Sequence, residues 1–184
     1  CEGQQYDIDF EDRNNVTLEE YLHMINYKTA VLVGAAMQMG AIVADASVKS
    51  QNAIYEFGRN LGIAFQLQDD FLDVFGDPKT FGKQVGGDVI SNKKTYLYLI
   101  AKKESTPVDS KELEHLYSIE PKNPTDKIEA VKRIFVKSGA RDKTKTQIKQ
   151  YTEKAIQLLY EMDLDENGKD QLTVFANNLI ARDV

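Results

Sequence analysis

The segment Phe65–Asp77, with the sequence FQLQDDFLDVFGD, places three carboxylates within five positions of a strongly apolar stretch. Apolar residues recur at steps of three and four along Ser50–Phe75, and this periodicity predicts one long helix that the following Gly-Asp-Pro sequence ends. Residues three and four apart share one face of a helix, so we expect a polar stripe on this largely apolar helix. The stripe consists of Gln66, Asp69, Asp70 and Asp73.

Negative charges this close together need a compensating partner. Like charges at i,i+4 destabilise a helix by roughly 0.2–0.5 kcal/mol when exposed, and desolvation increases the cost if the stripe faces inward. Every candidate ligand is an oxygen atom, which favours a hard divalent cation, and Mg²⁺ fits best because one or two carboxylates hold it together with substrate phosphates. The alternative is a solvated acidic face or a set of salt-bridge partners, and the pattern D-D-x-x-D alone does not separate the two.

The glycine-rich segment after this helix favours the metal interpretation. Its glycines predict a loop over Lys79–Asn92. This segment and the residues just after it bring Lys83, Lys93 and Asp88 close in sequence to the three aspartates. Carboxylates, cations and flexible glycines together suit a metal-bound diphosphate.

Helical signals dominate the rest of the chain, and the predicted fold class is all-α. Thr17 and Glu20 form a capping box, T-x-x-E, ahead of an apolar-periodic run. Lys28–Ala44 is expected as a second helix or a kinked continuation of the helix before it. No segment alternates between polar and apolar residues as a strand would. The other expected helices are Leu18–Asn26, Lys93–Lys102, Asp109–Ser118, Thr125–Lys137, Ala140–Met162 and Glu166–Arg182.

Composition excludes several classes of protein. The net charge of -6, without a basic arm or stripe, argues against a nucleic-acid partner. The single cysteine, Cys1, cannot form an internal disulfide, which indicates a reducing compartment and a cytoplasmic location. The most apolar run, Ala30–Ala44, has about fifteen residues, fewer than the ~20 that span a bilayer. We therefore expect a buried helix there and no stable membrane insertion.

Three regions of the chain, which follow one another in the family's order, resemble one known family. FQLQDDFLDVFGD, followed by GKQVGGD and NKKTY, resembles the second aspartate-rich region of trans-isoprenyl diphosphate synthases, the polyprenyl synthetases of the farnesyl and geranylgeranyl diphosphate synthase type. Upstream, YLHMINYKTAVLVGAAMQMGAIVA resembles the Lys-Thr helix of that family, and GQQYDIDF resembles the segment just before it. The likeness covers most of Gly3–Lys102.

The resemblance implies an isoprenoid-synthase-type helical bundle around a central cavity. It also implies that an allylic diphosphate (dimethylallyl, geranyl or farnesyl) is condensed with isopentenyl diphosphate to a short-chain isoprenyl diphosphate. The steps would be Mg²⁺-assisted ionisation, condensation and proton elimination. A homodimer is implied as well, and the small residues of the Ala30–Ala44 helix suit a tight contact between copies.

By the same resemblance, the acidic residues are metal-binding. Asp69, Asp70 and Asp73 match the second aspartate-rich motif, and Asp69 is the strongest candidate for direct ligation. Asp88 matches a position that is associated with the metal ions through water.

The resemblance also assigns the residues around the leaving group. Lys28, Lys83 and Lys93 match residues that contact the departing diphosphate. Thr29 and Gln66 match residues that line the place where positive charge develops, so Lys28, Thr29 and Gln66 are the predicted catalytic residues.

The first aspartate-rich motif of the family, its neighbouring arginines and the basic residues that bind isopentenyl diphosphate are missing from these 184 residues. Residues 1–184 therefore resemble the C-terminal portion of a single polyprenyl synthetase domain whose N-terminal helices precede Cys1. Such a portion is not expected to catalyse alone, and the product chain length cannot be read from it.

Three alternative interpretations fit the sequence less well. A non-catalytic partner subunit of a heteromeric prenyl synthase would favour a degraded second motif, and a terpene cyclase usually carries an Asn/Ser/Glu version, whereas Asp-Asp-x-x-Asp is intact here. The segment Asp163–Val174 mimics the first half of a calcium loop, but Val174 stands where such a loop needs Glu. A helix connection through Asn167-Gly168 is favoured there.

Overall fold

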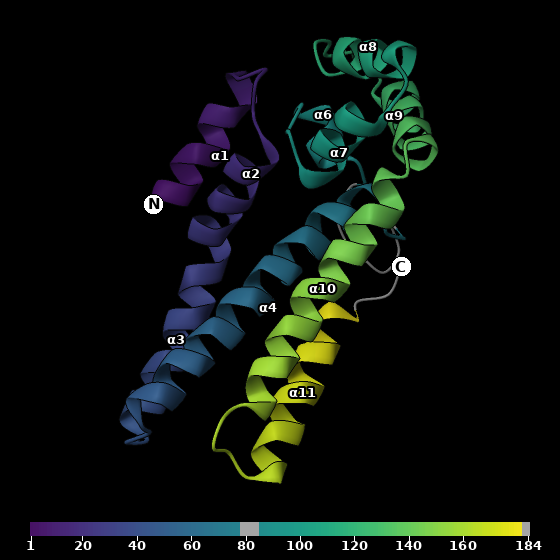
Figure 1. Ribbon diagram of the computed structural model, residues 1–184. Coiled ribbons are helices and arrows are strands. Elements are labelled where there is room, and N and C mark those ends of the chain that lie inside the picture. The colour runs from purple at the N-terminus through teal and green to yellow at the C-terminus, as the bar shows by residue number, and fades with distance from the viewer. Residues whose placement is uncertain (78–84, 182–184) are drawn as a thin grey trace. The chain divides into compact units, whose positions relative to one another are not determined.

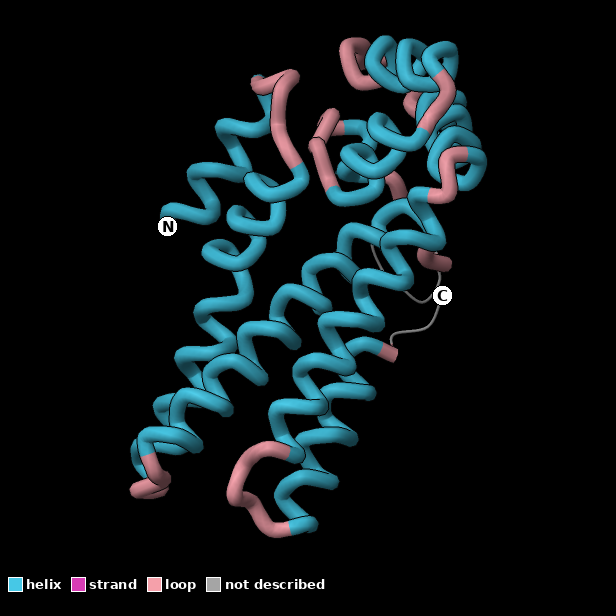
Figure 2. Tube along the Cα trace, in the orientation of Figure 1, coloured by secondary structure: helices cyan, strands magenta, loops and turns pink. Residues whose placement is uncertain are grey.

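The computed structural model in Figures 1 and 2 describes residues 1–77 and 85–181. Within these ranges all regular structure is helical, which confirms the predicted all-α class. The elements are α1 (Glu2–Asp12), α2 (Leu18–Ile25), the π-helix η1 (Asn26–Ala30), α3 (Val31–Val43), α4 (Val48–Phe75), α6 (Gly87–Ile90), α7 (Tyr96–Glu104), α8 (Pro107–Leu116), α9 (Thr125–Lys137), α10 (Ala140–Tyr160) and α11 (Glu166–Ile180).

Most of the predicted helices are present, within a few residues of the expected ends. The capping box forms as expected, because the Thr17 N–H donates to Glu20 Oε2 (2.8 Å) and the Glu20 N–H donates to Thr17 Oγ1 (3.2 Å). Two helices of the described ranges were not predicted. The first, α1, has few apolar residues to give a periodic signal, and the second, α6, is only four residues long and interrupts the predicted loop over Lys79–Asn92.

The chain forms two compact units. The first comprises Cys1–Gln4, Leu22–Gln66 and residues 147–181, and the second comprises Gln5–Tyr21 and Leu67–Thr146. The core of the first unit joins Phe57 and Leu61 of α4 to residues of the last two helices and of the connection between them. The latter are Ala155, Leu159, Met162 and Ala176, all buried.

In the first unit, η1 joins α2 to α3 without a break. The Val31 N–H donates to the Asn26 carbonyl, five residues back, so one extra residue is accommodated in this turn. This outcome matches the expected kinked continuation. The expected burial of the Ala30–Ala44 helix is wrong, because the large apolar side chains Leu32, Met39, Ile42 and Val43 are 50–85% exposed. Gly34 of α3 packs so closely on α4 that a Cβ there would lie 2.8 Å from the Tyr55 carbonyl oxygen, so this small residue serves a contact within the chain.

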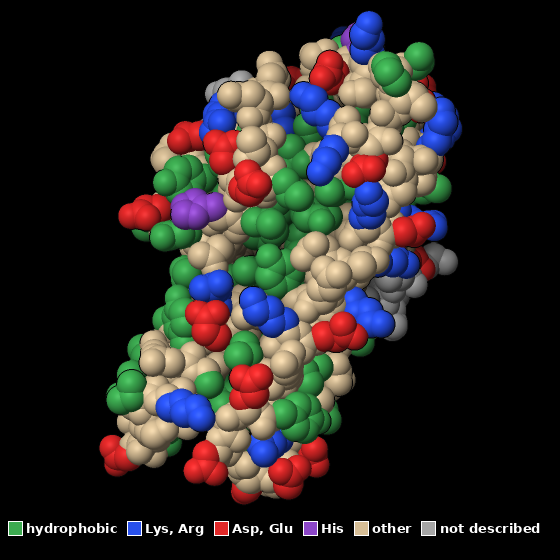
Figure 3. All heavy atoms as spheres, viewed as in Figure 1, with side chains coloured by type: hydrophobic (Ala, Val, Ile, Leu, Met, Phe, Trp, Pro, Cys, Tyr) green, Lys and Arg blue, Asp and Glu red, His purple; other side chains and the backbone are tan. Residues whose placement is uncertain are grey.

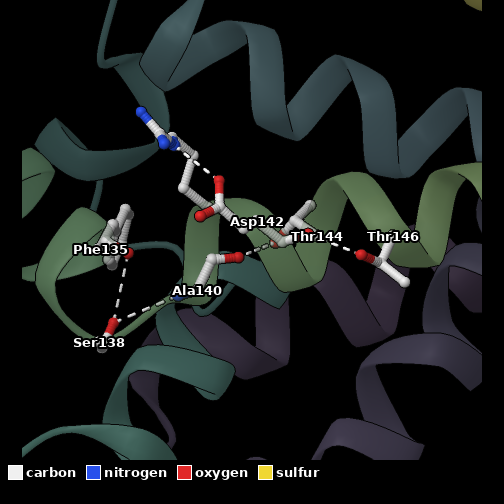
Figure 4. A network of polar contacts seen from close by, with 7 residues as sticks. Phe135, Ser138, Ala140, Asp142, Thr144 and Thr146 are labelled. Carbon is white, nitrogen blue, oxygen red and sulfur yellow. Dashed lines mark hydrogen bonds and ion pairs between the residues drawn. The ribbon is translucent and has the colours of Figure 1, made fainter.

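In the second unit, α6 packs against α9, while α7 and α8 pack against each other and against α9. The connection from α9 to α10 is held by hydroxyl groups (Figure 4). Ser138 Oγ donates to the Phe135 carbonyl (3.3 Å) and accepts from the Ala140 N–H (3.4 Å), while the buried Thr144 Oγ1 donates to the Ala140 carbonyl (2.8 Å). The two bonds of Ser138 satisfy backbone groups that helix ends leave unpaired, whereas the Thr144 bond lies within the first turns of α10.

The calcium-like segment is a helix start. Asp165 is the N-cap of α11, and its Oδ1 accepts from the Gly168 N–H at 2.7 Å. The prediction that Asn167-Gly168 connects two helices is therefore wrong, because both residues lie in the first turn of α11.

The face in Figure 3 carries Lys, Arg, Asp and Glu side chains interspersed, without a basic stripe. No helix within residues 1–77 and 85–181 is long and apolar enough to span a membrane.

Asp109 at the start of α8 gives a pH-dependent prediction. The Lys137 ammonium lies 2.7 Å from Asp109 Oδ2 and, with the Thr106 hydroxyl, holds the pKa of this carboxyl below its ordinary value of 3.8. A carboxylate with a lowered pKa in the folded state stabilises the fold above its unfolded pKa, and the contribution disappears as the pH falls through the folded value. We expect Asp109→Asn to lower the melting temperature at pH 7, and the difference from wild type to close below about pH 4.

Thermal melts followed by circular dichroism across this pH range would check the prediction. Asp142→Asn is the matched control, because its partner Arg141 is adjacent in sequence and the pair is exposed, so it contributes little. A gap that stays constant down to about pH 2 would contradict the assigned role of the Asp109 carboxylate.

Candidate functional site

The three aspartates of α4 lie in different environments. Asp70 is only 7% exposed, whereas Asp69 and Asp73 are half-buried. Of the three aspartates in the predicted stripe, one is thus buried in the second unit and two reach its surface. The alternative of a fully solvated acidic face does not hold.

Asp73 is fixed by the backbone of the segment that leads into α6. Its Oδ2 accepts the Asp88 N–H at 2.9 Å, and its carbonyl accepts the Gly86 N–H at 2.6 Å. Burial raises the pKa of Asp73, while the hydrogen bonds from the Asp88 and Gly87 amides oppose that rise and the charge of Asp69 adds to it. A carboxylate held by backbone amides has a fixed position, which a metal ligand requires.

Lys93 lies between Asp88, which was predicted as metal-binding, and Asp7 of α1. Its Nζ is 3.8 Å from Asp88 Oδ1 and 3.8 Å from Asp7 Oδ2. Burial alone would lower the pKa of Lys93, but the charges of Asp7, Asp88, Glu11 and Asp70 outweigh it, so the pKa is raised and the side chain stays a cation.

Asp7 of α1 was missed as a site residue. It lies in the GQQYDIDF segment that carried the family resemblance, but no motif rule singled it out, and α1 was not predicted as a helix. Only the structure shows that Asp7 reaches Lys93.

Asp70 is held by a buried tyrosine. The Tyr21 hydroxyl donates to Asp70 Oδ2 at 2.5 Å, and Tyr21 is 1% exposed. Burial and then the neighbouring Asp70 charge raise the pKa of Tyr21 well above its ordinary value of 10.0, so the phenol remains a donor. Charge-assisted hydrogen bonds of this kind are about twice as strong as neutral ones.

The first unit holds the other predicted residues. Lys28 and Thr29 lie within the π-helix η1, and the Thr29 hydroxyl donates to Gln66 Oε1 at 2.8 Å. Two glycines allow close approach to η1. A Cβ at Gly3 would lie 2.1 Å from the Lys28 backbone nitrogen, and a Cβ at Gly62 would lie 2.6 Å from Ala30 Cα. Irregular turns of this kind are frequent at functional sites.

The predicted residues therefore form two groups, one in each unit. Thr29 and Gln66 are hydrogen-bonded in the first unit, where Lys28 also lies, and the second unit contains the four aspartates and Lys93. Lys83 lies outside the described residues. Within residues 1–77 and 85–181, no three His, Cys, Asp or Glu side chains are grouped closely enough to hold a metal ion on their own. Any ion here would need further ligands, as Mg²⁺ commonly takes from substrate phosphates and water.

Comparison with known proteins identifies the family. The family model described as polyprenyl synthetase matches residues 1–134, and the chain belongs to this family. It is 36% identical over 181 residues to a geranylfarnesyl diphosphate synthase of Aeropyrum pernix, covering 98% of this chain and 55% of the relative. The chain thus spans about half the length of the curated relatives that it matches.

Solved structures give the same answer. The crystal structure of a geranylgeranyl pyrophosphate synthase superposes with a TM-score of 0.93 at 46% identity, covering 100% of this chain and 57% of that chain. A geranylgeranyl pyrophosphate synthase of Corynebacterium glutamicum, complexed with isoprenyl diphosphate and magnesium, has a TM-score of 0.89 at 28% identity, covering 99% of this chain and 52% of that one. The helical fold is therefore an isoprenyl-synthase fold.

The hydrogen bond between Tyr21 and Asp70 gives a prediction about stability. Tyr21→Phe leaves a buried carboxylate without this donor, and a buried group that loses its partner costs about 1–3 kcal/mol. We expect the free energy of unfolding, measured by urea denaturation, to fall by about that amount. Tyr160→Phe removes an exposed hydroxyl and serves as the control, with no change expected. Equal stability of Tyr21→Phe and wild type would mean that this bond contributes nothing to the fold.

Proposed function

We propose that the protein containing this chain is a prenyltransferase. It condenses an allylic diphosphate (dimethylallyl, geranyl or farnesyl) with isopentenyl diphosphate to a short-chain isoprenyl diphosphate. The observation that carries the proposal is the intact Asp-Asp-x-x-Asp of α4, whose Asp73 is bound by backbone amides next to the segment that contains Lys93. Membership of the polyprenyl synthetase family and the names of the relatives support it.

The donor set fits Mg²⁺. The candidate ligands are carboxylate oxygens, which magnesium prefers, and a Cβ at Gly87 would lie only 3.2 Å from Asp73 Oδ1, so a side chain there would crowd this carboxylate. Asp69 and Asp73 are proposed as ligands and Asp88 as a contact through water. Asp70, whose Oδ2 accepts from Tyr21, is proposed to supply charge to the metal site.

Bound Mg²⁺ would neutralise the charge that accumulates on pyrophosphate as the allylic C–O bond breaks. Lys28, Lys83 and Lys93 are proposed to contact the same leaving group, because fixed cations there stabilise the transition state. Thr29 and Gln66 are proposed to place polar oxygens beside the developing allylic cation, and their mutual hydrogen bond fixes both side chains.

A homodimer is proposed, with α3 at the interface. Val31–Val43 contains no charged residue, and an apolar row at steps of four, three and four faces outward. The outer edge of α3 accordingly shows hydrophobic side chains in Figure 3. The large members of this row are Leu32 (70% exposed), Met39 (58%) and Val43 (85%). A cytoplasmic location is part of the same proposal.

The test uses the full-length protein, labelled isopentenyl diphosphate, an allylic primer and Mg²⁺. We expect a lipid-soluble product, and Asp69→Ala should cut turnover by orders of magnitude while the melting temperature stays level or rises, since like-charge repulsion is relieved. Asp142→Ala, at an exposed position on α10, is the matched control and should leave turnover unchanged. No product from a folded protein would favour a non-catalytic partner subunit, and unchanged turnover of Asp69→Ala would remove the carboxylates from the metal site.

The dimer has its own test. Met39→Glu places a charge in the apolar row of α3, and burying an unpaired charge at an interface is costly. We expect the molar mass from size-exclusion chromatography with light scattering to fall from that of a dimer towards that of a monomer. Val174→Glu, at another exposed apolar position (57% exposed), should leave the mass unchanged. A dimer that persists in Met39→Glu would place the interface elsewhere.

A further inference from the structure

Lys127 of α9 is a buried lysine that binds two other segments of the second unit. The residue is 3% exposed, and its Nζ donates to Asn92 Oδ1 (2.7 Å), to the Ile119 carbonyl (2.9 Å) and to the Ile90 carbonyl (3.5 Å). Ile90 ends α6, Asn92 lies between α6 and α7, and Ile119 follows α8. One ammonium group on α9 therefore binds both the turn that contains Ile90 and Asn92 and the segment after α8.

Oxygen dipoles, and not a carboxylate, compensate this charge. Within the described part of the chain, the Lys127 ammonium forms no ion pair at 4.0 Å or less, and it lies 5.9 Å from the centre of the Tyr117 ring. Burial lowers the pKa of Lys127, and the more distant Glu120 only partly opposes this. A methylene chain would fill the same space without a desolvation cost, so packing alone does not account for a lysine here.

The acceptor with the shortest distance is the residue before Lys93. Asn92 has a φ of +56°, in the left-handed region that Asn tolerates better than most residues. Its N–H donates to the Val89 carbonyl (3.3 Å), and the Lys93 N–H donates to the Asp88 carbonyl (2.9 Å). The turn formed by residues 88–93 thus has Asp88 at one end and Lys93 at the other, and Lys127 binds its middle.

We propose that Lys127 is a positioning residue for the diphosphate site, which acts through Asn92 to fix the turn that carries Asp88 and Lys93. This inference rests on the proposed function, because it assumes that Lys93 contacts diphosphate. A polar anchor with two directional bonds to the turn specifies one conformation of it, whereas an apolar side chain would allow several. The same turn also fixes Asp73, whose Oδ2 accepts the Asp88 N–H.

Two variants of the full-length protein remove the anchor from opposite sides. Lys127→Met keeps the length and removes the donors, and Asn92→Gly keeps access to positive φ and removes the acceptor. Lys137→Met is the matched control, because it makes the same substitution on the same helix but in a side chain that binds Asp109. Thr144→Val is the control for stability, since it removes a buried hydroxyl bond in the same unit.

Three measurements separate positioning from general stability. In the unliganded protein, hydrogen exchange of the amides in residues 90–95 should become faster in Lys127→Met and Asn92→Gly. Binding of inorganic pyrophosphate with Mg²⁺, measured by calorimetry, should weaken by roughly tenfold, the lower end of what loss of a supporting contact costs a metal site. The KM for the allylic diphosphate should rise more than kcat falls. Both controls should leave exchange in this turn and pyrophosphate affinity as in wild type.

The proposal is overturned if Lys127→Met folds and shows wild-type exchange in residues 90–95, or if Thr144→Val weakens pyrophosphate binding as much as Lys127→Met does. The failure of the proposed function has a different signature. In that case wild type does not bind pyrophosphate, or Lys93→Ala binds it unchanged, while the exchange measurement still decides whether Lys127 holds the turn.

Discussion

The organisation of the second unit depends on the partly or fully buried aspartate carboxylates of α4. Two aspartates of the motif are compensated by different kinds of donor. Asp73 takes backbone amides from the segment that leads into α6, and Asp70 takes the hydroxyl of Tyr21. The short helix α6 and the first turn of α2 are therefore joined to α4 by hydrogen bonds to carboxylates, and not by apolar packing alone.

Lys93 shows that the same residues serve both the fold and the proposed chemistry. Its ammonium lies between Asp7 and Asp88, which raise its pKa against the effect of burial. A cation held in this way remains charged. Its two ion pairs, each with an N–O distance of 3.8 Å, are weak enough for phosphate oxygens to replace the carboxylates. The arrangement suits a site that has to bind and then release an anion.

The sequence predicted the features that have a local cause. The capping box at Thr17, the long helix α4 and the stripe of aspartates follow from spacing alone, and the family resemblance supplied Lys28, Thr29 and Gln66. The π-helix was not predicted, and the close approach of Gly3 and Gly62 to it involves residues that are distant in sequence. Asp7 and Lys127 were missed for the same reason, since their partners are distant in sequence and neither residue belongs to a periodic pattern.

The π-helix also sets the rotational register of α3. One residue of an α-helix turns the chain by about 100°, so the extra residue in Asn26–Ala30 decides which side of α3 faces outward. Deletion of a single residue there would restore ordinary helical hydrogen bonding, yet it would swing Leu32, Met39 and Val43 away from their present direction. The outward direction of the apolar row therefore depends on the number of residues in Asn26–Ala30 as well as on the side chains of α3.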